Sequence, residues 1–332
     1  MPELPELPEL PGGLTARPLH ADDMAALADL VADAEVVDAS GENEDAEGLA
    51  EFLVNDRVDL GLDTVAVLDG DHLVAYASTV DLGDHRDEYA VMASGCVHPR
   101  WRGRGIGRAL IGWETARCGE LHRERHPEMP GRLGIGAPSA NTSLERLVQR
   151  LGFQPVQYYF VMRRPLTDLP PVRAVEGVDL VPFDADRDEE VRRVHNLAFV
   201  DHFGTAERDA YAWQTWFTGQ KAFRPELSWL ALADGAVVGY SLAYEHDADT
   251  EATGVREAYL GQVGVLPAAR GRGVASACIV ASLHAAAGDE LGRAALTVDT
   301  NNTTGALGLY EHLGFVVEGR ETVWAYRVPP AA

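Results

Sequence analysis

The chain has 332 residues, of which 46% are hydrophobic, and its formal net charge at pH 7 is −24. That length can supply two ordinary hydrophobic cores, and the strong negative charge argues against a nucleic-acid partner. Because the sequence has neither a run of about 18 apolar residues nor a basic-then-apolar start, it predicts a cytoplasmic protein without a membrane partner.

Three cysteines, Cys96, Cys118 and Cys278, stand far apart in the sequence. Their spacing matches no metal or redox motif, so they are predicted to be buried, reduced thiols, and no metal site is expected.

The first 13 residues repeat Pro-Glu-Leu three times and are predicted to form a disordered tail. A short strand is expected at Leu14–Arg17, followed by a helix that starts at His20 and a second helix at Asp45–Val54. The dipeptide Asp69-Gly70 predicts a hairpin turn.

The next stretch begins with a long predicted strand, Tyr89–Val97, and an arginine- and glycine-rich loop. A helix is expected from Ile106 to about Leu121, and a charged loop at 122–131. Three further elements then close the first predicted domain: a strand near Leu133–Ala137, a helix from about Ser143 to Arg150 and a strand at Val156–Met162.

Prolines mark a predicted linker at residues 166–176, after which the same plan recurs. The expected elements are a helix at Asp188–Phe203, a hairpin at Asp234-Gly235, strands at Tyr259–Val265 and Ala294–Thr300, and a helix at Gly305–His312.

An internal repeat explains this recurrence. Val97 to Gly107 aligns without a gap with Val265 to Ala275, at an offset of 168 residues, and Leu151-Gly152-Phe153 aligns with Leu313-Gly314-Phe315. Several markers in the same order at a nearly constant offset indicate a duplicated domain.

The most informative stretch follows the predicted strand that ends at Val265. Pro267 stops the strand, and Arg270-Gly271-Arg272-Gly273 then leads into an apolar helix. Helix N-termini expose unpaired N–H groups, and glycine lets a ligand approach the backbone closely, so this turn is suited to bind phosphate. Neither a P-loop nor a dinucleotide fingerprint fits the residues present.

The segment Arg-x-x-Gly-x-Ala after a strand resembles the pyrophosphate loop of the GNAT acetyltransferase superfamily, whose members bind acetyl-CoA. The segment Leu309-Tyr310-Glu311-His312-Leu313-Gly314-Phe315 is similar to the superfamily pattern Leu-Tyr-x-x-x-Gly-Phe. The tandem arrangement resembles two-domain enzymes of the mycothiol synthase type, which acetylate the amine of a small cysteine-containing sugar conjugate.

This resemblance implies an α/β (α+β) fold with two GNAT-like domains, each a mixed, mostly antiparallel sheet with helices on both faces. The expected boundaries are 14–165 for a degenerate N-terminal domain and 177–328 for a catalytic C-terminal domain.

The resemblance also implies acetyl-CoA as co-substrate and a set of residues that bind it. In the second domain these are Val263, Gly264, Val265, Arg270, Gly271, Arg272, Gly273, Val274, Ala275, Ser276 and Asn302, with Asn301 as the alternative to Asn302. In the first domain they are Val97, Arg102, Gly103, Arg104, Gly105, Ile106 and Gly107.

Within this set, Val263 and Val265 are expected to pair with pantetheine on a strand edge that splays from its neighbour. A backbone N–H near Val265 would polarise the thioester carbonyl, and Gly264 is expected to form the bulge that permits the splay.

Tyr310 is the expected general acid, because a neutral phenol can protonate the departing thiolate. The corresponding residue of the first domain is Val148, which has no proton to give. Catalysis is therefore expected in the second domain. The alternative for Tyr310 is a core tyrosine with a bonded hydroxyl.

A general base must take a proton from the attacking ammonium. Glu257 and Tyr259 are candidates, as are Glu245 and His246 beside them, and the sequence does not choose among these four. The aromatic run Tyr211, Trp213, Trp216 and Phe217 is interpreted either as a substrate wall or as core.

Together these features predict an N-acetyltransferase that acts on a primary amine of a small molecule, as a monomer or homodimer. A non-catalytic acyl-CoA sensor and a protein or peptide acetyltransferase are the alternatives.

Overall fold

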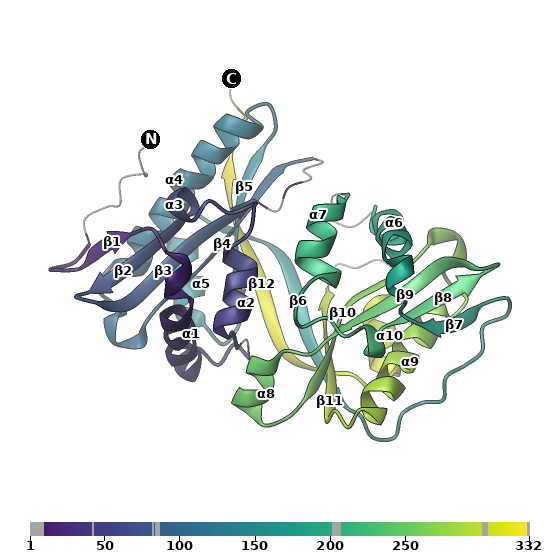
Figure 1. Ribbon diagram of the computed structural model, residues 1–332. Helices are drawn as coiled ribbons and strands as arrows, with labels where there is room; N and C mark the ends of the chain where they lie inside the picture. The colour runs from purple at the N-terminus through teal and green to yellow at the C-terminus, as the bar shows by residue number, and fades with distance from the viewer. Residues whose placement is uncertain are drawn as a thin grey trace. The chain divides into compact units, whose positions relative to one another are not determined.

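The computed structural model describes residues 10–41, 43–81, 83, 87–200, 207–300 and 305–330. The chain divides into two compact units (Figure 1). Unit 1 comprises Met1–Gln157 and Glu321–Ala332, and unit 2 comprises Tyr158–Arg320.

The sheet of unit 1 has the order β1-β2-β3-β4-β5-β12. Neighbouring strands run antiparallel except β4 and β5, which run parallel. The strands are β1 Thr15–Arg17, β2 Thr64–Asp69, β3 His72–Asp81, β4 Tyr89–Val97, β5 Gly131–Pro138 and the part of β12 (Val316–Val328) from Glu321 onward.

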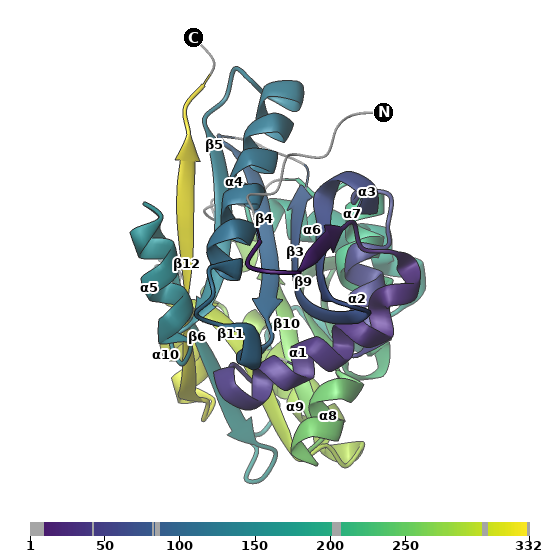
Figure 2. The ribbon, with the colours of Figure 1, turned by 90° about the vertical axis from the view of Figure 1, so that its left-hand side faces the viewer.

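Helices cover both faces of this sheet. Leu27, Leu30 and Leu49, from α1 and α2, pack with Tyr76 on one face. On the other face α4 and α5 pack against β4 and β5, and Figure 2 shows α4 beside β5 and α5 beside β12. The helices are α1 Met24–Asp38, α2 Ala46–Leu53, α3 Leu60–Asp63, α4 Ile106–Arg125 and α5 Thr142–Arg150.

Unit 2 repeats this plan. Its sheet has the order β7-β8-β9-β10-β11-β6, and β10 and β11 are its parallel pair. The strands are β7 Asp179–Pro182, β8 Trp229–Ala233, β9 Ala236–Tyr244, β10 Glu257–Val265, β11 Arg293–Asp299 and the part of β6 (Gln154–Pro165) from Tyr158 onward. The helices are α6 Asp188–Ala198, α7 Ala210–Trp213, α8 Asp247–Thr253, α9 Val274–Gly288 and α10 Ala306–His312.

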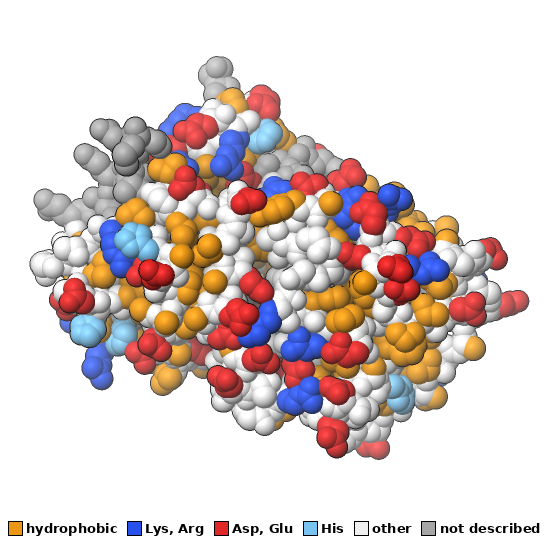
Figure 3. Space-filling view, in the orientation of Figure 1, with side chains coloured by type: hydrophobic (Ala, Val, Ile, Leu, Met, Phe, Trp, Pro, Cys, Tyr) orange, Lys and Arg blue, Asp and Glu red, His pale blue; other side chains and the backbone are white. Residues whose placement is uncertain are grey.

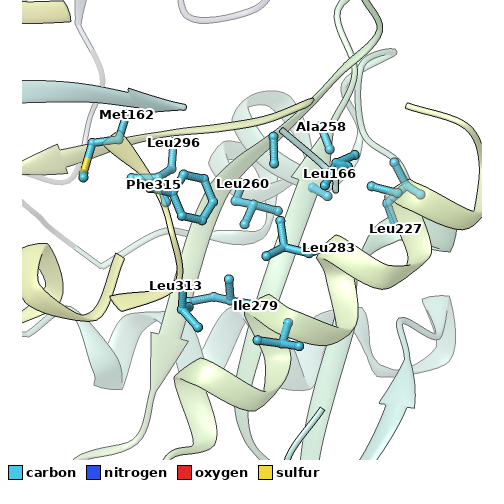
Figure 4. Close-up of a cluster of buried hydrophobic side chains, with 14 of the residues drawn as sticks. Met162, Leu166, Leu227, Ala258, Leu260, Ile279, Leu283, Leu296, Leu313 and Phe315 are labelled. Atoms are coloured by element: carbon cyan, nitrogen blue, oxygen red, sulfur yellow. The ribbon is translucent and has the colours of Figure 1, made fainter. Parts of the chain in front are cut away.

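The main core of unit 2 lies between the sheet and helices α9 and α10. Figure 4 shows Ile279 and Leu283 of α9 directed toward Leu260 of β10, with Leu313 and Phe315 beside them. All five side chains are at least 95% buried, so the segment Leu-Gly-Phe, shared by both repeats, marks the point where a helix returns to the core.

The expected fold class is confirmed, since each unit is a mixed, mostly antiparallel sheet with helices on both faces. Some boundaries differ from the sequence-based ones. Helix α4 continues to Arg125, because Leu121 and His122 are buried while the charged residues after them face outward. Helix α6 ends at Ala198, before the predicted Phe203, and α8 was not predicted.

The last strand of each sheet comes from the other half of the sequence. Residues 159–165 of β6 pair with β11, and residues 321–328 of β12 pair with β5. The expected boundaries of 14–165 and 177–328 assign these strands the other way round. Both strands follow a Leu-Gly-Phe segment, so the local sequence gives each strand the same signal and does not specify which sheet it joins.

Acidic side chains are spread over the face shown in Figure 3, with basic ones between them. Among the described residues, no helix is long and apolar enough to cross a membrane.

We expect Phe315→Ala to lower the free energy of unfolding by about 3–5 kcal/mol, because it leaves a cavity in a close-packed core. Phe315 is 2% exposed, whereas Val316, next to it, is 58% exposed. Val316→Ala is therefore the matched control, with an expected change below about 0.5 kcal/mol. Denaturant unfolding measures both, and equal midpoints would contradict the assignment of Phe315 to the core.

Candidate functional site

In unit 2 the parallel strands β10 and β11 share only a short ladder. Glu257, Ala258 and Tyr259 pair with residues 293–295, whereas β10 stays paired with β9 as far as Val265. Beyond Tyr259 the edge of β10 that faces β11 is therefore unpaired. Val263 and Val265 lie on this edge, where an extended ligand can add main-chain hydrogen bonds.

The bulge in β10 lies at Gly261 and not at the expected Gly264. The register against β9 shifts between Leu260 and Gln262, while Gly264 pairs regularly with Tyr240. Gly264 is needed for a different reason, because a Cβ atom there would lie 2.6 Å from the Tyr240 ring. A Cβ atom on Gly261 would lie 2.7 Å from the ring of Tyr244, so the bulge also depends on glycine.

The loop after β10 has the geometry expected of an anion site. Gly273 is the N-cap of α9 with φ 88°, in the left-handed region, and no side chain caps the helix. Val274, Ala275 and Ser276 form the first turn, whose N–H groups have no intrahelical acceptor. A Cβ atom on Gly273 would meet no atom within 4 Å, so the backbone conformation, and not crowding, requires glycine here.

The arginines of this loop brace the backbone. Arg270 donates to the carbonyl oxygens of Val265 and Ala198, at 3.2 and 2.7 Å, and Arg272 donates to that of Glu176 at 2.6 Å. The backbone N–H groups are therefore the donors in this loop best placed for a phosphate, and the arginines add positive charge nearby.

Unit 1 has an equivalent loop. Gly105 has φ 93° and is the N-cap of α4, and Gly103 has φ 75°. Arg102 donates to the carbonyl oxygen of Val97 at 2.8 Å and forms a bidentate ion pair with Asp38 of α1, at 2.6 and 2.7 Å. Arg104 donates to the carbonyl oxygen of Arg100.

A cavity of about 840 Å³ extends from this loop into unit 1. Residues of the loop, of β4, of α4 and of the face covered by α1 and α2 line it; among them are Val97, Arg102, Gly103, Gly105, Ile106 and Gly107. Cys96 also lines the cavity, and burial raises the pKa of its thiol to about 12. This cysteine is therefore protonated near neutral pH and is a poor nucleophile.

Tyr310 lies on α10 and packs against the main core of unit 2, with its ring centroid 6.1 Å from that of Phe315. Burial raises the pKa of Tyr310 to about 12, and the neighbouring Tyr259 contributes to the shift. The structure thus brings together two tyrosines that the sequence singled out. Val148, at the equivalent position of unit 1, is fully buried among apolar side chains.

The two acidic candidates for the base are buried in ion pairs. Glu257 accepts from Arg163 at 2.8 Å and also contacts Arg293, and it is the first residue of β10, remote from the unpaired edge. Glu245 pairs with Arg256 at 2.6 Å and with Arg224 at 3.4 Å. Such partners hold a carboxylate in place and compete with a substrate ammonium for it.

Tyr259 lies at the last ladder position of β10, where the two strands part. Its ring centroid is 6.2 Å from that of His246. Tyr244, opposite Tyr259 on β9, has a buried hydroxyl without a hydrogen-bond partner among the described residues. Tyr244 is not among the residues predicted from the sequence, and only its pairing opposite Tyr259 across the sheet indicates it.

The aromatic run of unit 2 is mostly core. Trp213 and Phe217 are 1% and 7% exposed, and their rings stack with centroids 4.6 Å apart. The Trp213 indole N–H donates to Asp188 at 2.7 Å. Tyr211, by contrast, is 39% exposed. Trp213 and Phe217 therefore stabilise the face of the sheet and do not line an open wall.

Asn301 and Asn302 lie outside the described residues. Among the residues that the structure describes, no group of three or more His, Cys, Asp or Glu side chains could hold a metal ion.

Comparison with known proteins relates both halves of the chain to one family. Residues 189–315 match the model of the Acetyltransferase (GNAT) family, and residues 62–155 match that of the Acetyltransferase (GNAT) domain. The chain is 32% identical over 269 residues to a mycothiol acetyltransferase of Mycobacterium sp. (strain JLS), which covers 76% of this chain and 79% of that protein.

Solved structures agree with this relationship. A GCN5-related N-acetyltransferase from Sphaerobacter thermophilus is 26% identical, with a TM-score of 0.76 and 98% of each chain covered. A tandem GNAT protein from the clavulanic acid biosynthesis pathway has a TM-score of 0.66 at 18% identity, covering 96% of this chain and 100% of that one. At that identity the second likeness concerns the fold alone.

We expect Gly261→Ala to lower acetyl transfer, because the added methyl group meets the Tyr244 ring at 2.7 Å and displaces the bulge where the strands part. Gly308→Ala in α10 is the control, since a Cβ atom there meets nothing within 4 Å and alanine favours a helix. The measurement is the steady-state rate of CoA release. Equal rates in Gly261→Ala and the parent would show that the bulge does not shape the site.

Proposed function

Because the chain belongs to the GNAT acetyltransferase family and transfers an acetyl group from acetyl-CoA to an amine, we propose that unit 2 catalyses this transfer. We propose further that the acceptor is the primary amine of a small molecule. The observation that carries the proposal is the difference between Tyr310 and Val148. One repeat has a partly buried phenol that interacts with Tyr259, where the strands part, and the other has an apolar side chain at the same position.

In the proposed reaction the unpaired edge of β10 binds pantetheine, and the first turn of α9 binds the pyrophosphate. The amine nitrogen attacks the thioester carbonyl carbon, the C–S bond breaks, and the sulfur takes its proton from the Tyr310 hydroxyl. The proton lost by the amine passes to a base, directly or through water. Holding both substrates in one unit converts the step into an effectively unimolecular one.

The pKa of Tyr310 supports the acid role. At about 12 it keeps the phenol protonated over the whole physiological range, so the acid is always ready. Among the four base candidates, Tyr259 is favoured by its place where the strands part, whereas Glu257 and Glu245 are held by arginines. We propose Tyr259 as the group that relays the proton, accepting it at the phenol oxygen while its own hydroxyl proton passes to water.

A small acceptor is supported by the similarity of the chain to mycothiol acetyltransferases. The acceptor to test first is a cysteinyl amino-sugar conjugate, with a peptide carrying a free amine as the competing class. A rate for the peptide equal to or above that for the conjugate would favour a peptide acetyltransferase.

We expect Tyr310→Phe to lower kcat well over tenfold with little change in acetyl-CoA affinity, because it removes one proton donor and keeps the ring. Tyr326→Phe, on β12 of unit 1, is the matched control and is expected to keep parent activity. Steady-state assays measure kcat, and calorimetry measures acetyl-CoA binding. Parent turnover in Tyr310→Phe would remove Tyr310 from the mechanism.

The same acid assignment predicts the shape of the pH profile. A general acid must be protonated to act, so activity is lost only as pH rises through its pKa, which is about 12 for Tyr310. Activity is therefore expected to rise to a plateau and to show no alkaline decline from this group below about pH 10. A fall centred between pH 7 and 9, in a protein that stays folded, would assign the acid elsewhere.

Acetyl-CoA binding by each unit is tested by counting sites. Gly273→Glu and Gly105→Glu each place a carboxylate and a strained φ at one helix N-terminus, and each is expected to abolish binding in its own unit. Calorimetric titration should give two sites for the parent and one for each variant. One site in the parent, lost only in Gly273→Glu, would restrict binding to unit 2.

A further inference from the structure

Two carboxylic acids that line the unit 1 cavity, Glu114 and Glu321, form no hydrogen bond or ion pair with any residue that the structure describes. Glu114 is 3% exposed, on the inward face of α4. Glu321 projects from β12 over Gly136 of β5, where a Cβ atom would lie 2.4 Å from Glu321 Oε1. The acetyl transfer proposed for unit 2 uses neither of them.

Both acids lie near the point where the parallel strands of unit 1 part. The β4–β5 ladder ends at Ala93 and Ile135, so Ser94 and Gly136 are the first residues beyond it. The Ser94 and Tyr76 hydroxyls are 3.1 Å apart, and Glu114 is near enough to Tyr76 to contribute to its raised pKa. Glu321 therefore approaches this point from β12, across β5, and Glu114 approaches it from α4.

A buried carboxylate without a partner is costly, and burial accordingly raises the pKa of both groups, that of Glu114 most strongly. A bound cation removes this cost, because it supplies the missing charge partner and allows the carboxyl groups to ionise.

The other charged groups of the cavity do not fill this role. Asp38 and Arg102 neutralise each other, and Glu35 accepts bonds from Ser40 and Gly41. The remaining charged groups that line the cavity are Glu44, Arg108, Arg146 and Arg150, and no arginine pairs with Glu114 or Glu321. The cavity thus presents the Glu114 and Glu321 carboxyl groups in addition to the glycine loop.

We propose that the unit 1 cavity is a binding site for a small aliphatic amine cation, held by Glu114 and Glu321 beside the Tyr76–Ser94 hydroxyl pair. This site is additional to the proposed acceptor site of unit 2 and does not depend on Tyr310. The second repeat has Ser282 at the position of Glu114, so unit 2 has no carboxyl group at this position.

The proposal predicts a proton linkage. Because burial raises the pKa of the Glu114 carboxyl group, the empty cavity favours its protonated form, and ionisation when the cation binds releases a proton. Affinity should therefore increase as pH rises toward the pKa of the empty site, by up to about tenfold per pH unit for one released proton.

The test is calorimetric titration of the full chain with 1,4-diaminobutane, in two buffers of different ionisation enthalpy, with 1,4-butanediol as the neutral probe. We expect the diamine to bind with proton release and the diol not to bind. Glu114→Gln and Glu321→Gln, which keep side-chain size, should each weaken diamine binding about tenfold or more, as expected when a charged hydrogen bond is lost.

Glu124→Gln is the matched control, because Glu124 is an exposed carboxylate on the same helix, and it should bind like the parent. Unchanged diamine affinity in both Glu114→Gln and Glu321→Gln, each shown to be folded by its thermal transition, would overturn the proposal. So would the absence of diamine binding to the parent. Because the readout is binding, it is independent of whether Tyr310→Phe loses activity.

Discussion

In each unit two parallel strands share hydrogen bonds for part of their length and then separate, and the rest of the site depends on that separation. β10 remains paired with β9 after it leaves β11, so it keeps its extended shape while one edge stays open. Unpaired backbone groups are costly unless water or a ligand satisfies them. An extended ligand is thus favoured where β10 lacks a neighbouring strand.

The open edge requires support from the loop that follows it. Arg102 and Arg270 each donate to the carbonyl oxygen of the last residue of the preceding strand and to a second group, on α1 or at the last residue of α6. The arginines therefore fix the start of the helix relative to the strand, and the N–H groups of the helix start remain available to the ligand. One sequence pattern produces the same arrangement in both repeats.

The sequence allowed this loop to be predicted because its chemistry is local. A positive φ at Gly105 and Gly273 follows from glycine at a helix start, and a repeat makes the pattern visible twice. The bulge was misplaced, because Gly261 and Gly264 are both glycines and only the aromatic side chains on β9 distinguish their roles. The arginine partners of Glu257 come from β6 and β11, so spacing along the chain could not indicate them.

The exchange of the last strands between the two sheets is the feature that local sequence predicts least. It also changes which side chains reach the cavity of unit 1. A chain folded with each strand in its own half would place a residue of β6 beside Gly136. The observed pairing places Glu321 there and so adds a carboxyl group to the unit 1 cavity. The first repeat itself has Val148 where the second has the phenol of Tyr310. The two repeats form similar sheets, and the pairing of the last strands gives the sheet of unit 1 a carboxyl group where its own repeat has Tyr159.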